Sequence, residues 1–122
     1  MVIGTGIDVI EVERVKKAAA KPAFLNRVFT RAEQDYFERF GFEAQTIAGT
    51  FAAKEAIAKA LAVGFKGIRW MDIEILHDDN GKPYAALQNG ALSRLEELAG
   101  KRVHVSISHI KQLAVAQAIV ED

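Results

Sequence analysis

The chain has 122 residues, of which 50% are apolar and 26% charged, a balance that predicts one compact globular domain over residues 1–122. It has no cysteine, which excludes a disulfide scaffold, a thiolate zinc site and a cysteine nucleophile and favours the reducing cytoplasm. Sixteen basic residues balance sixteen acidic ones, and neither a signal peptide nor an apolar run of membrane-spanning length occurs. We therefore expect no nucleic-acid partner and no membrane association.

The chain begins with an apolar segment, residues 2–10, which we predict to be a strand. Gly4 and Gly6 within it leave room for another backbone or for a ligand. Helices follow: one over residues 11–20, ended by Pro22, and a short one over residues 23–29.

Two further helices are predicted in the middle of the chain. Thr30 and Glu33 have the spacing of a capping box and Gly41 supplies a stop, so we expect a helix over residues 31–40. The segment over residues 43–63 is rich in alanine and apolar on nearly every side, which predicts a buried helix that ends near Gly64.

The last part of the chain predicts two hairpins with a helix between them. Residues 71–77 alternate in polarity, a turn follows at 79–81, and residues 84–87 return as the second strand. Asn89 is a candidate cap for a helix that ends near Gly100. Residues 102–108 and 113–120 form the second hairpin. The fold class is therefore α+β, with a largely antiparallel sheet against a long buried helix.

Two carboxylates stand among apolar neighbours. Asp8 lies in the first strand and Glu55 in the buried helix, where an unpaired charge is costly, so each needs a cation, a hydrogen-bond network or a metal. Alternatively, Asp8 caps the next helix, and Glu55 pairs with Lys59 one turn away. Taken together, two carboxylates beside a lysine are typical of magnesium sites whose coordination is completed by substrate phosphates.

Other polar residues are less specific. Thr46, Thr50 and Lys54 recur at helical spacing, and we interpret Lys54 as part of the solvated edge of the helix. Ser108 and His109 lack a visible orienting acid, which argues against a hydroxyl nucleophile, although both suit hydrogen bonding to a phosphate or a base. We interpret the remaining histidines, His77 and His104, as structural.

The region from residue 14 to residue 32 contains six basic residues and no acidic one. We define the basic face as these six: Arg14, Lys16, Lys17, Lys21, Arg27 and Arg31. Such a face fits a solvated surface or an acidic partner better than nucleic acid, because few aromatic residues are interleaved with it. An alternative to an enzyme is thus a non-catalytic module that binds an acidic protein through this face, and a magnesium-dependent nuclease or phosphatase is a further one.

Three blocks of sequence resemble the holo-acyl-carrier-protein synthase family, the small 4'-phosphopantetheinyl transferases. They are residues 4–8 (GTGID) with Glu11 and Arg14, residues 51–56 (FAAKEA) with Lys59, and residues 105–109 (VSISH). The DIEI segment at 72–75 and the NGKP segment at 80–83 extend the resemblance over most of the chain.

The resemblance implies transfer of 4'-phosphopantetheine from coenzyme A to a serine of apo acyl carrier protein, a step that serves fatty acid biosynthesis. It implies Mg²⁺ held by Asp8 and Glu55, and Lys59 at the phosphates. It places His109, Ser108, Gly81 and Pro83 on the coenzyme A side. The carrier protein would contact basic residues of the first helices, which are Arg14, Lys17, Lys21 and Arg27. It also implies a homotrimer with sites between subunits.

Two positions depart from the family's pattern. The residue before the FAAKEA block is commonly arginine and here is Thr50, while the residue after the VSISH block is commonly small and polar and here is Ile110. Both departures concern the nucleotide contacts and leave the magnesium chemistry unchanged.

Overall fold

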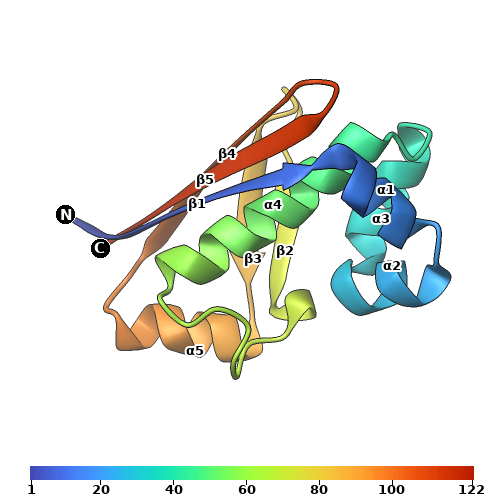
Figure 1. Ribbon diagram of the computed structural model, residues 1–122. Helices are drawn as coiled ribbons and strands as arrows, with labels where there is room; N and C mark the ends of the chain where they lie inside the picture. Colours follow the sequence, from blue (N-terminus) through green and yellow to red (C-terminus); the bar gives the residue numbers. More distant parts are fainter.

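The computed structural model describes residues 1–122 and places helices and strands in the predicted order (Figure 1). The elements are β1 (Val2–Glu11), α1 (Val12–Ala19), α2 (Pro22–Val28), α3 (Arg31–Arg39), α4 (Ala44–Ala60), the 3-10 turn η1 (Trp70–Asp72), β2 (Ile73–His77), β3 (Pro83–Leu87), α5 (Asn89–Glu97), β4 (Arg102–His109) and β5 (Leu113–Glu121). None of the helices combines the length and the apolar composition that crossing a bilayer requires.

The strands form two antiparallel sheets, which confirms the predicted α+β class. Sheet A has three strands in the order β1-β5-β4, and β2 pairs with β3 in a separate hairpin. The two ends of the chain lie side by side at one end of sheet A (Figure 1). There the N-terminal amino group is 2.7 Å from Oδ1 of Asp122.

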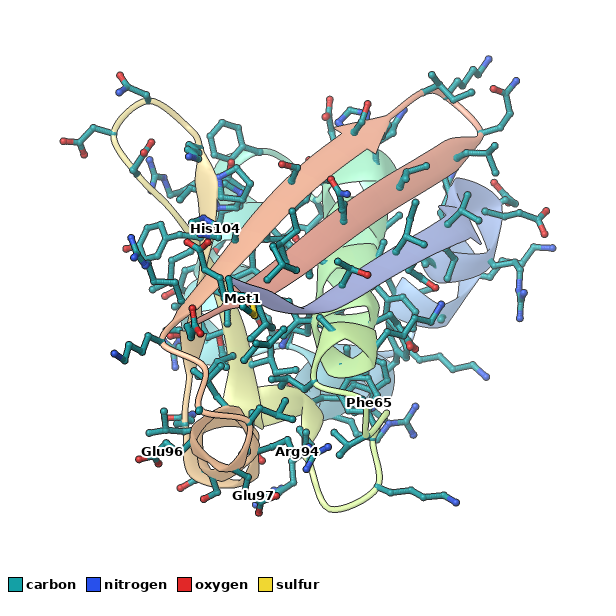
Figure 2. The ribbon with its side chains drawn as sticks, turned by 90° about the vertical axis from the view of Figure 1, so that its left-hand side faces the viewer. Met1, Phe65, Arg94, Glu96, Glu97 and His104 are labelled. Atoms are coloured by element: carbon teal, nitrogen blue, oxygen red, sulfur yellow. The ribbon has the colours of Figure 1, made fainter.

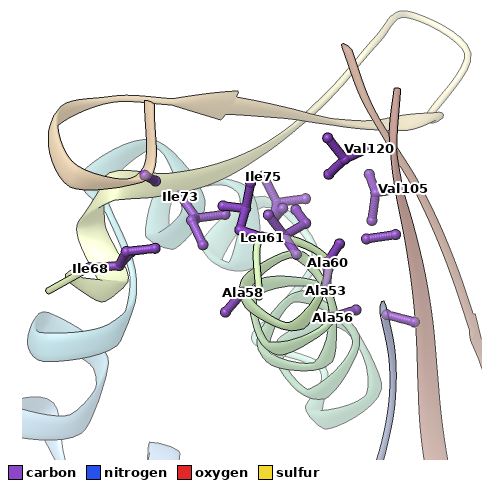
Figure 3. Close-up of a cluster of buried hydrophobic side chains, with 14 of the residues drawn as sticks. Ala53, Ala56, Ala58, Ala60, Leu61, Ile68, Ile73, Ile75, Val105 and Val120 are labelled. Carbon is purple, nitrogen blue, oxygen red and sulfur yellow. The ribbon is translucent and has the colours of Figure 1, made fainter. Parts of the chain in front are cut away.

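Helix α4 lies between sheet A and the β2–β3 hairpin, and the main core forms on both of its sides (Figure 3). Its alanines allow close approach to sheet A, where a Cβ on Gly4 or Gly6 would overlap the carbonyl oxygens of Ala60 and Ala56. The glycines therefore make room for another backbone, one of the two predicted alternatives. On the hairpin side, Ile73 and Ile75 are buried with Leu61 of the turn after α4.

A second core joins helices α1, α2 and α3 to the beginning of α4. Phe29 and Phe37 are its largest members; they are fully buried and meet edge to face with ring centroids 4.9 Å apart. Edge-to-face geometry is favourable for aromatic pairs. This core fixes the three short helices at one end of α4, where Figure 1 shows them gathered.

The predicted capping signals located both ends of α3 but not the end of α4 or the start of α5. Thr30 and Glu33 form the predicted capping box, and Gly41, in the left-handed region with φ of 70°, ends α3 as expected. Helix α4 stops at Ala60, earlier than predicted, because Ala62 itself adopts φ of 59°. The Ala62 amide donates to the Lys59 carbonyl and that of Val63 to the Ala58 carbonyl, which completes a Schellman motif without glycine.

Two predictions about polar residues are wrong. Asn89 is not the cap of α5: Gln88 occupies that position, and Asn89 is the first helical residue. Lys54 is not part of a solvated edge, because its side chain is fully buried and lies 2.6 Å from Oε1 of Glu33, itself fully buried. Thr46, Thr50 and Lys54 do lie on one side of α4, as their spacing predicts, but α2 and α3 cover Lys54 on that side. Thr50, on the same side, is 3% exposed.

Candidate active site

Asp8, Glu55 and Lys59 line one cavity of about 520 Å³ between β1 and α4. Asp8 belongs to β1, which runs on to Glu11, so Asp8 is a strand residue and not a helix cap. Its side of the strand also carries Gly4 and Gly6, which rest on α4. Among residues 51–60 of α4, only Phe51, Glu55 and Lys59 are not buried, and all three line this cavity. Arg14 of α1 also contributes to the wall.

Within this cavity Lys59 is bound to β1. Its Nζ donates to Oδ1 of Asp8 over 3.2 Å and to the carbonyl oxygen of Ile7 over 3.0 Å. Lys59 therefore pairs with Asp8, and the alternative Glu55–Lys59 ion pair does not form. Half of the Lys59 side chain, 52%, stays exposed, so the ammonium group is accessible to an anion in the cavity.

Glu55 lies where its charge is unfavourable. Burial raises the pKa of this carboxyl, and the nearby negative charge of Asp8 raises the pKa further, while Lys59 opposes the shift. A carboxylate in such a position gains from a cation that it shares with its neighbour.

The donor set indicates which metal the cavity fits. No three side chains among His, Cys, Asp and Glu lie close enough to form a metal site by themselves. Three carboxylates line this cavity: Asp8 and Glu55 come from the facing elements β1 and α4, and Glu11 from the end of β1. Two hard carboxylate donors such as Asp8 and Glu55 suit a Mg²⁺ ion that takes its remaining ligands from water and substrate phosphates. The residues present therefore fit magnesium bound together with a phosphate substrate.

A second cavity, of about 180 Å³, contains His109 at the end of β4 together with Gly81 and Pro83 of the hairpin. Thr50, one of the departures from the family's pattern, also lines it, whereas Ile110 does not. Ser108 points to the opposite side of β4, as strand alternation requires, and lines neither of these two cavities.

Part of this second cavity is not predicted by the sequence. Tyr36 and His77 both line it, and their rings stack with centroids 4.0 Å apart and an interplanar angle of 3°. Burial lowers the pKa of His77, which favours a neutral ring. No local signal identifies this pair, since Tyr36 comes from α3 and His77 from β2. The same two rings and Gly81 also border a neighbouring cavity of about 560 Å³.

The two cavities lie on different sides of α4 and share no residue. The first uses Phe51, Glu55 and Lys59, which recur every four residues along the helix. The second uses Thr46, Gly49 and Thr50, and at 100° per residue these project from the other side. In one chain, the residues expected at the phosphates and those expected at the nucleotide are therefore separated.

All six residues of the basic face are exposed on the short helices or the turn between α1 and α2. Arg31 forms an ion pair with Asp35 over 3.4 Å. The other five residues have no acidic partner within ion-pair distance in the chain, so their charge is free to attract an acidic surface. Arg14 connects the basic face to the cavity of Asp8 and Glu55, because it belongs to both.

Comparison with known proteins assigns the family. Residues 4–118 match the family described as the 4'-phosphopantetheinyl transferase superfamily. The chain is 45% identical to a holo-[acyl-carrier-protein] synthase of Clostridium tetani over 122 residues, covering 99% of this chain and 97% of the relative. The structure of the Neisseria meningitidis synthase superposes with a TM-score of 0.91 at 32% identity, with 100% of both chains covered.

A second solved structure resembles the chain and includes a ligand. The Bacillus anthracis synthase, described as a complex with CoA (3',5'-ADP), superposes with a TM-score of 0.83 at 35% identity and covers 100% of this chain and 98% of that one. Sequence and fold agree along the whole length. The chain belongs to the 4'-phosphopantetheinyl transferase superfamily.

Proposed function

We propose that this protein is a holo-acyl-carrier-protein synthase, which transfers 4'-phosphopantetheine from coenzyme A to a serine of apo acyl carrier protein. The single observation that carries this proposal is the cavity in which Asp8 and Glu55 face the accessible ammonium group of Lys59. Membership of the family, matched over residues 4–118, supports assigning the transferase reaction to this cavity. The further assignment to fatty acid biosynthesis and to the cytoplasm belongs to the same proposal.

The reaction needs no nucleophile from the enzyme. The serine hydroxyl of the carrier protein loses its proton to solvent, and its oxygen forms a bond to the phosphorus of phosphopantetheine. The bond to the second phosphate breaks, and adenosine 3',5'-bisphosphate leaves. In such transfers a protein chiefly positions the groups and stabilises charge. Lys59 supplies a positive charge to the pyrophosphate, and Arg14, at the rim, faces both the cavity and the carrier protein.

Asp8 and Glu55 would hold the magnesium ion in this proposal. The ion, when bound, neutralises negative charge on the pyrophosphate. Asp8 has a second task that does not depend on the metal: it holds Lys59 on the β1 side of the cavity through the 3.2 Å contact. His109, with Gly81 and Pro83, would contact the nucleotide part of coenzyme A.

We further propose that the working unit is a homotrimer with its sites between subunits. The cavity of Asp8, Glu55 and Lys59, called the phosphate cavity here, and the His109 cavity lie on different sides of α4 and share no residue. A neighbouring subunit would place the His109 side of one chain beside the phosphate cavity of the next. The outer side of sheet A is open in Figure 2 and carries the exposed apolar residues Ile7 and Val9. Within a subunit, α4 and β5 contribute to both cores, which supports one transferase domain over residues 1–122.

The experiment is incubation of the protein with coenzyme A, MgCl₂ and apo carrier protein, followed by intact-mass measurement of the carrier. We expect a mass gain of one phosphopantetheine group, which disappears in chelator and in the Asp8→Ala and Glu55→Ala variants. A carrier of unchanged mass with the wild-type protein contradicts the transferase. Full transfer by both variants in chelator contradicts the assignment of the metal ligands.

A further inference from the structure

A buried ion pair lies apart from both cavities. Nζ of Lys54 in α4 is 2.6 Å from Oε1 of Glu33 in α3, and neither side chain is exposed to solvent. Nζ of Lys54 also donates to the carbonyl oxygen of Val28 over 2.8 Å and to that of Trp70 over 3.1 Å. An ammonium group has three donors, so every donor of Lys54 has an acceptor inside the protein.

Glu33 is equally well satisfied. Its Oε1 accepts from the amide of Thr30 over 2.7 Å, and its Oε2 accepts from the amide of Ile75 over 2.8 Å. These contacts, with those of Lys54, join the end of α2, the start of α3, the middle of α4, η1 and β2. One pair of side chains therefore connects five segments from three separate regions of the chain, around residues 28–33, 54 and 70–75.

Burying the two charges of this pair costs desolvation free energy, so the pair is a poor means of stabilising a core. Burial raises the pKa of Glu33 and lowers that of Lys54, which reflects the loss of water around both charges. Apolar side chains of similar volume are often as stabilising at such a position. What an apolar pair lacks is direction, because van der Waals contacts do not fix which group faces which. A network of five directed hydrogen bonds specifies one relative placement of these segments.

The segments it joins carry the parts of the proposed site. Lys54 directly precedes Glu55 on α4. Val28, whose carbonyl oxygen Lys54 holds, ends the helix that carries Arg27 of the basic face. Resting on the proposed function, we propose that Glu33 and Lys54 are positioning residues for the reaction. They set Arg27 and Arg31, the part of the basic face that α2 and α3 carry, at the correct distance and angle from Glu55 and Lys59 for docking of the acidic carrier protein.

This role separates the two substrates. The phosphate cavity is framed by β1 and α4, and their separation is set by the contacts of Gly4 and Gly6 with the backbone of α4. Loss of the buried pair therefore leaves the contacts of Asp8, Glu55 and Lys59 with the coenzyme A phosphates in place. It alters how α2 and α3 lie against α4, and with that the approach of the carrier serine.

The test is the double variant Glu33→Gln, Lys54→Met. It removes both charges together, so no unpaired charge stays buried, and methionine replaces the stem of the lysine. We expect kcat/KM for the carrier protein to fall about tenfold, with KM for coenzyme A within about twofold of the wild type. The matched control is Val120→Ala, which opens the core under β5 far from α2 and α3; it lowers stability and should change neither KM.

Wild-type kcat and KM for the carrier in the folded double variant would overturn the proposal, and so would an equal rise in both KM values. If the double variant does not fold, Glu33→Asp retains both charges and shortens one side chain. It should raise KM for the carrier about threefold without affecting coenzyme A, and unchanged kinetics there also overturn the proposal. A wild-type protein that transfers nothing is a separate result, since it refutes the proposed function and this inference with it.

Discussion

At the scale of single residues, the candidate active site depends on a carboxylate whose surroundings disfavour its charged form. Glu55 is partly buried with Asp8 beside it, and both effects disfavour its charged form. Such a carboxylate lowers the stability of the free protein at neutral pH and improves the binding of a cation. A bound cation thus offsets the electrostatic cost of the ionised Glu55 carboxylate, which the contacts within the chain do not remove.

This arrangement makes a prediction about pH. Because the folded pKa of Glu55 lies above its ordinary value of 4.5, the folded state binds this proton more tightly than the unfolded state. The contribution of Glu55 to the unfolding free energy is fully present below its ordinary pKa of 4.5, and it is lost as the pH rises through the folded pKa. Glu55→Gln should therefore gain unfolding free energy relative to the wild type between about pH 4 and about pH 7. Urea unfolding without divalent ions measures the two unfolding free energies. A difference between variant and wild type that stays constant over this pH range contradicts the prediction.

A second prediction concerns Arg14, which belongs to both the basic face and the phosphate cavity. Arg14→Glu places a negative charge where the acidic carrier docks, and it should raise KM for the carrier about tenfold. KM for coenzyme A should change much less. Steady-state kinetics with each substrate varied gives both values, with Lys66→Glu on a distant exposed loop as the control. A non-catalytic binding module would show no turnover and no affinity for coenzyme A in any of these proteins.

At the scale of elements, the contact of β1 with α4 decides the geometry of the phosphate cavity. Asp8 comes from the strand and Glu55 from the helix, so their separation depends on how closely the two backbones approach. Gly4 and Gly6 permit that approach, and each stands opposite a carbonyl oxygen of α4. The glycines therefore have a structural task that the chemistry of the site requires.

Gly6→Ala tests this contact. The added Cβ would overlap the carbonyl oxygen of Ala56, and backbone gives way less easily than a side chain. We expect a loss of about 3 kcal/mol in unfolding free energy. Thr5→Ala, on the exposed side of the same strand, should change it by less than about 0.5 kcal/mol. Chemical denaturation compares the two, and equal stability of both variants would show that α4 does not rest on Gly6.

At the scale of the whole molecule, the division of the site is the dominant feature. The residues expected at the phosphates and those expected at the nucleotide belong to cavities on different sides of α4. Sheet A leaves its outer side uncovered, with Ile7 exposed by 63% and Val9 by 60% (Figure 2). Exposed apolar residues that adjoin on a sheet are typical of an interface between subunits.

The trimer proposal predicts the effect of a charge on this side of the sheet. Ile7→Glu buries a carboxylate in the interface, so the protein should elute as a monomer in size-exclusion chromatography with light scattering, and transfer activity should be lost with the trimer. Leu92→Glu is the control, since Leu92 is an exposed apolar residue on α5, outside sheet A and both cavities. A wild-type protein that is already monomeric, or an active monomeric variant, contradicts the proposal.

Local chemistry in the sequence determined most of the elements and several of their ends. Apolar runs and alternation of apolar and polar residues identified the strands, and the Thr30–Glu33 capping box and Gly41 located α3. Two helix ends were misplaced because alanine, and not glycine, takes the left-handed position that ends the helix. Ala62 and Ala99 adopt the left-handed conformation that glycine usually supplies, with φ of 59° in both, so Gly64 and Gly100 were misleading stops.

By itself, the sequence determined the fold class and the carboxylates of interest, because strand and helix periods and the cost of a charge among apolar neighbours act over a few residues. Only the tertiary structure decided that Lys54 is buried against Glu33, that Tyr36 stacks on His77 and that the candidate site is divided. Each of these results depends on which element covers which side of α4. That choice is made by packing between segments far apart in the chain, and no local pattern contains it.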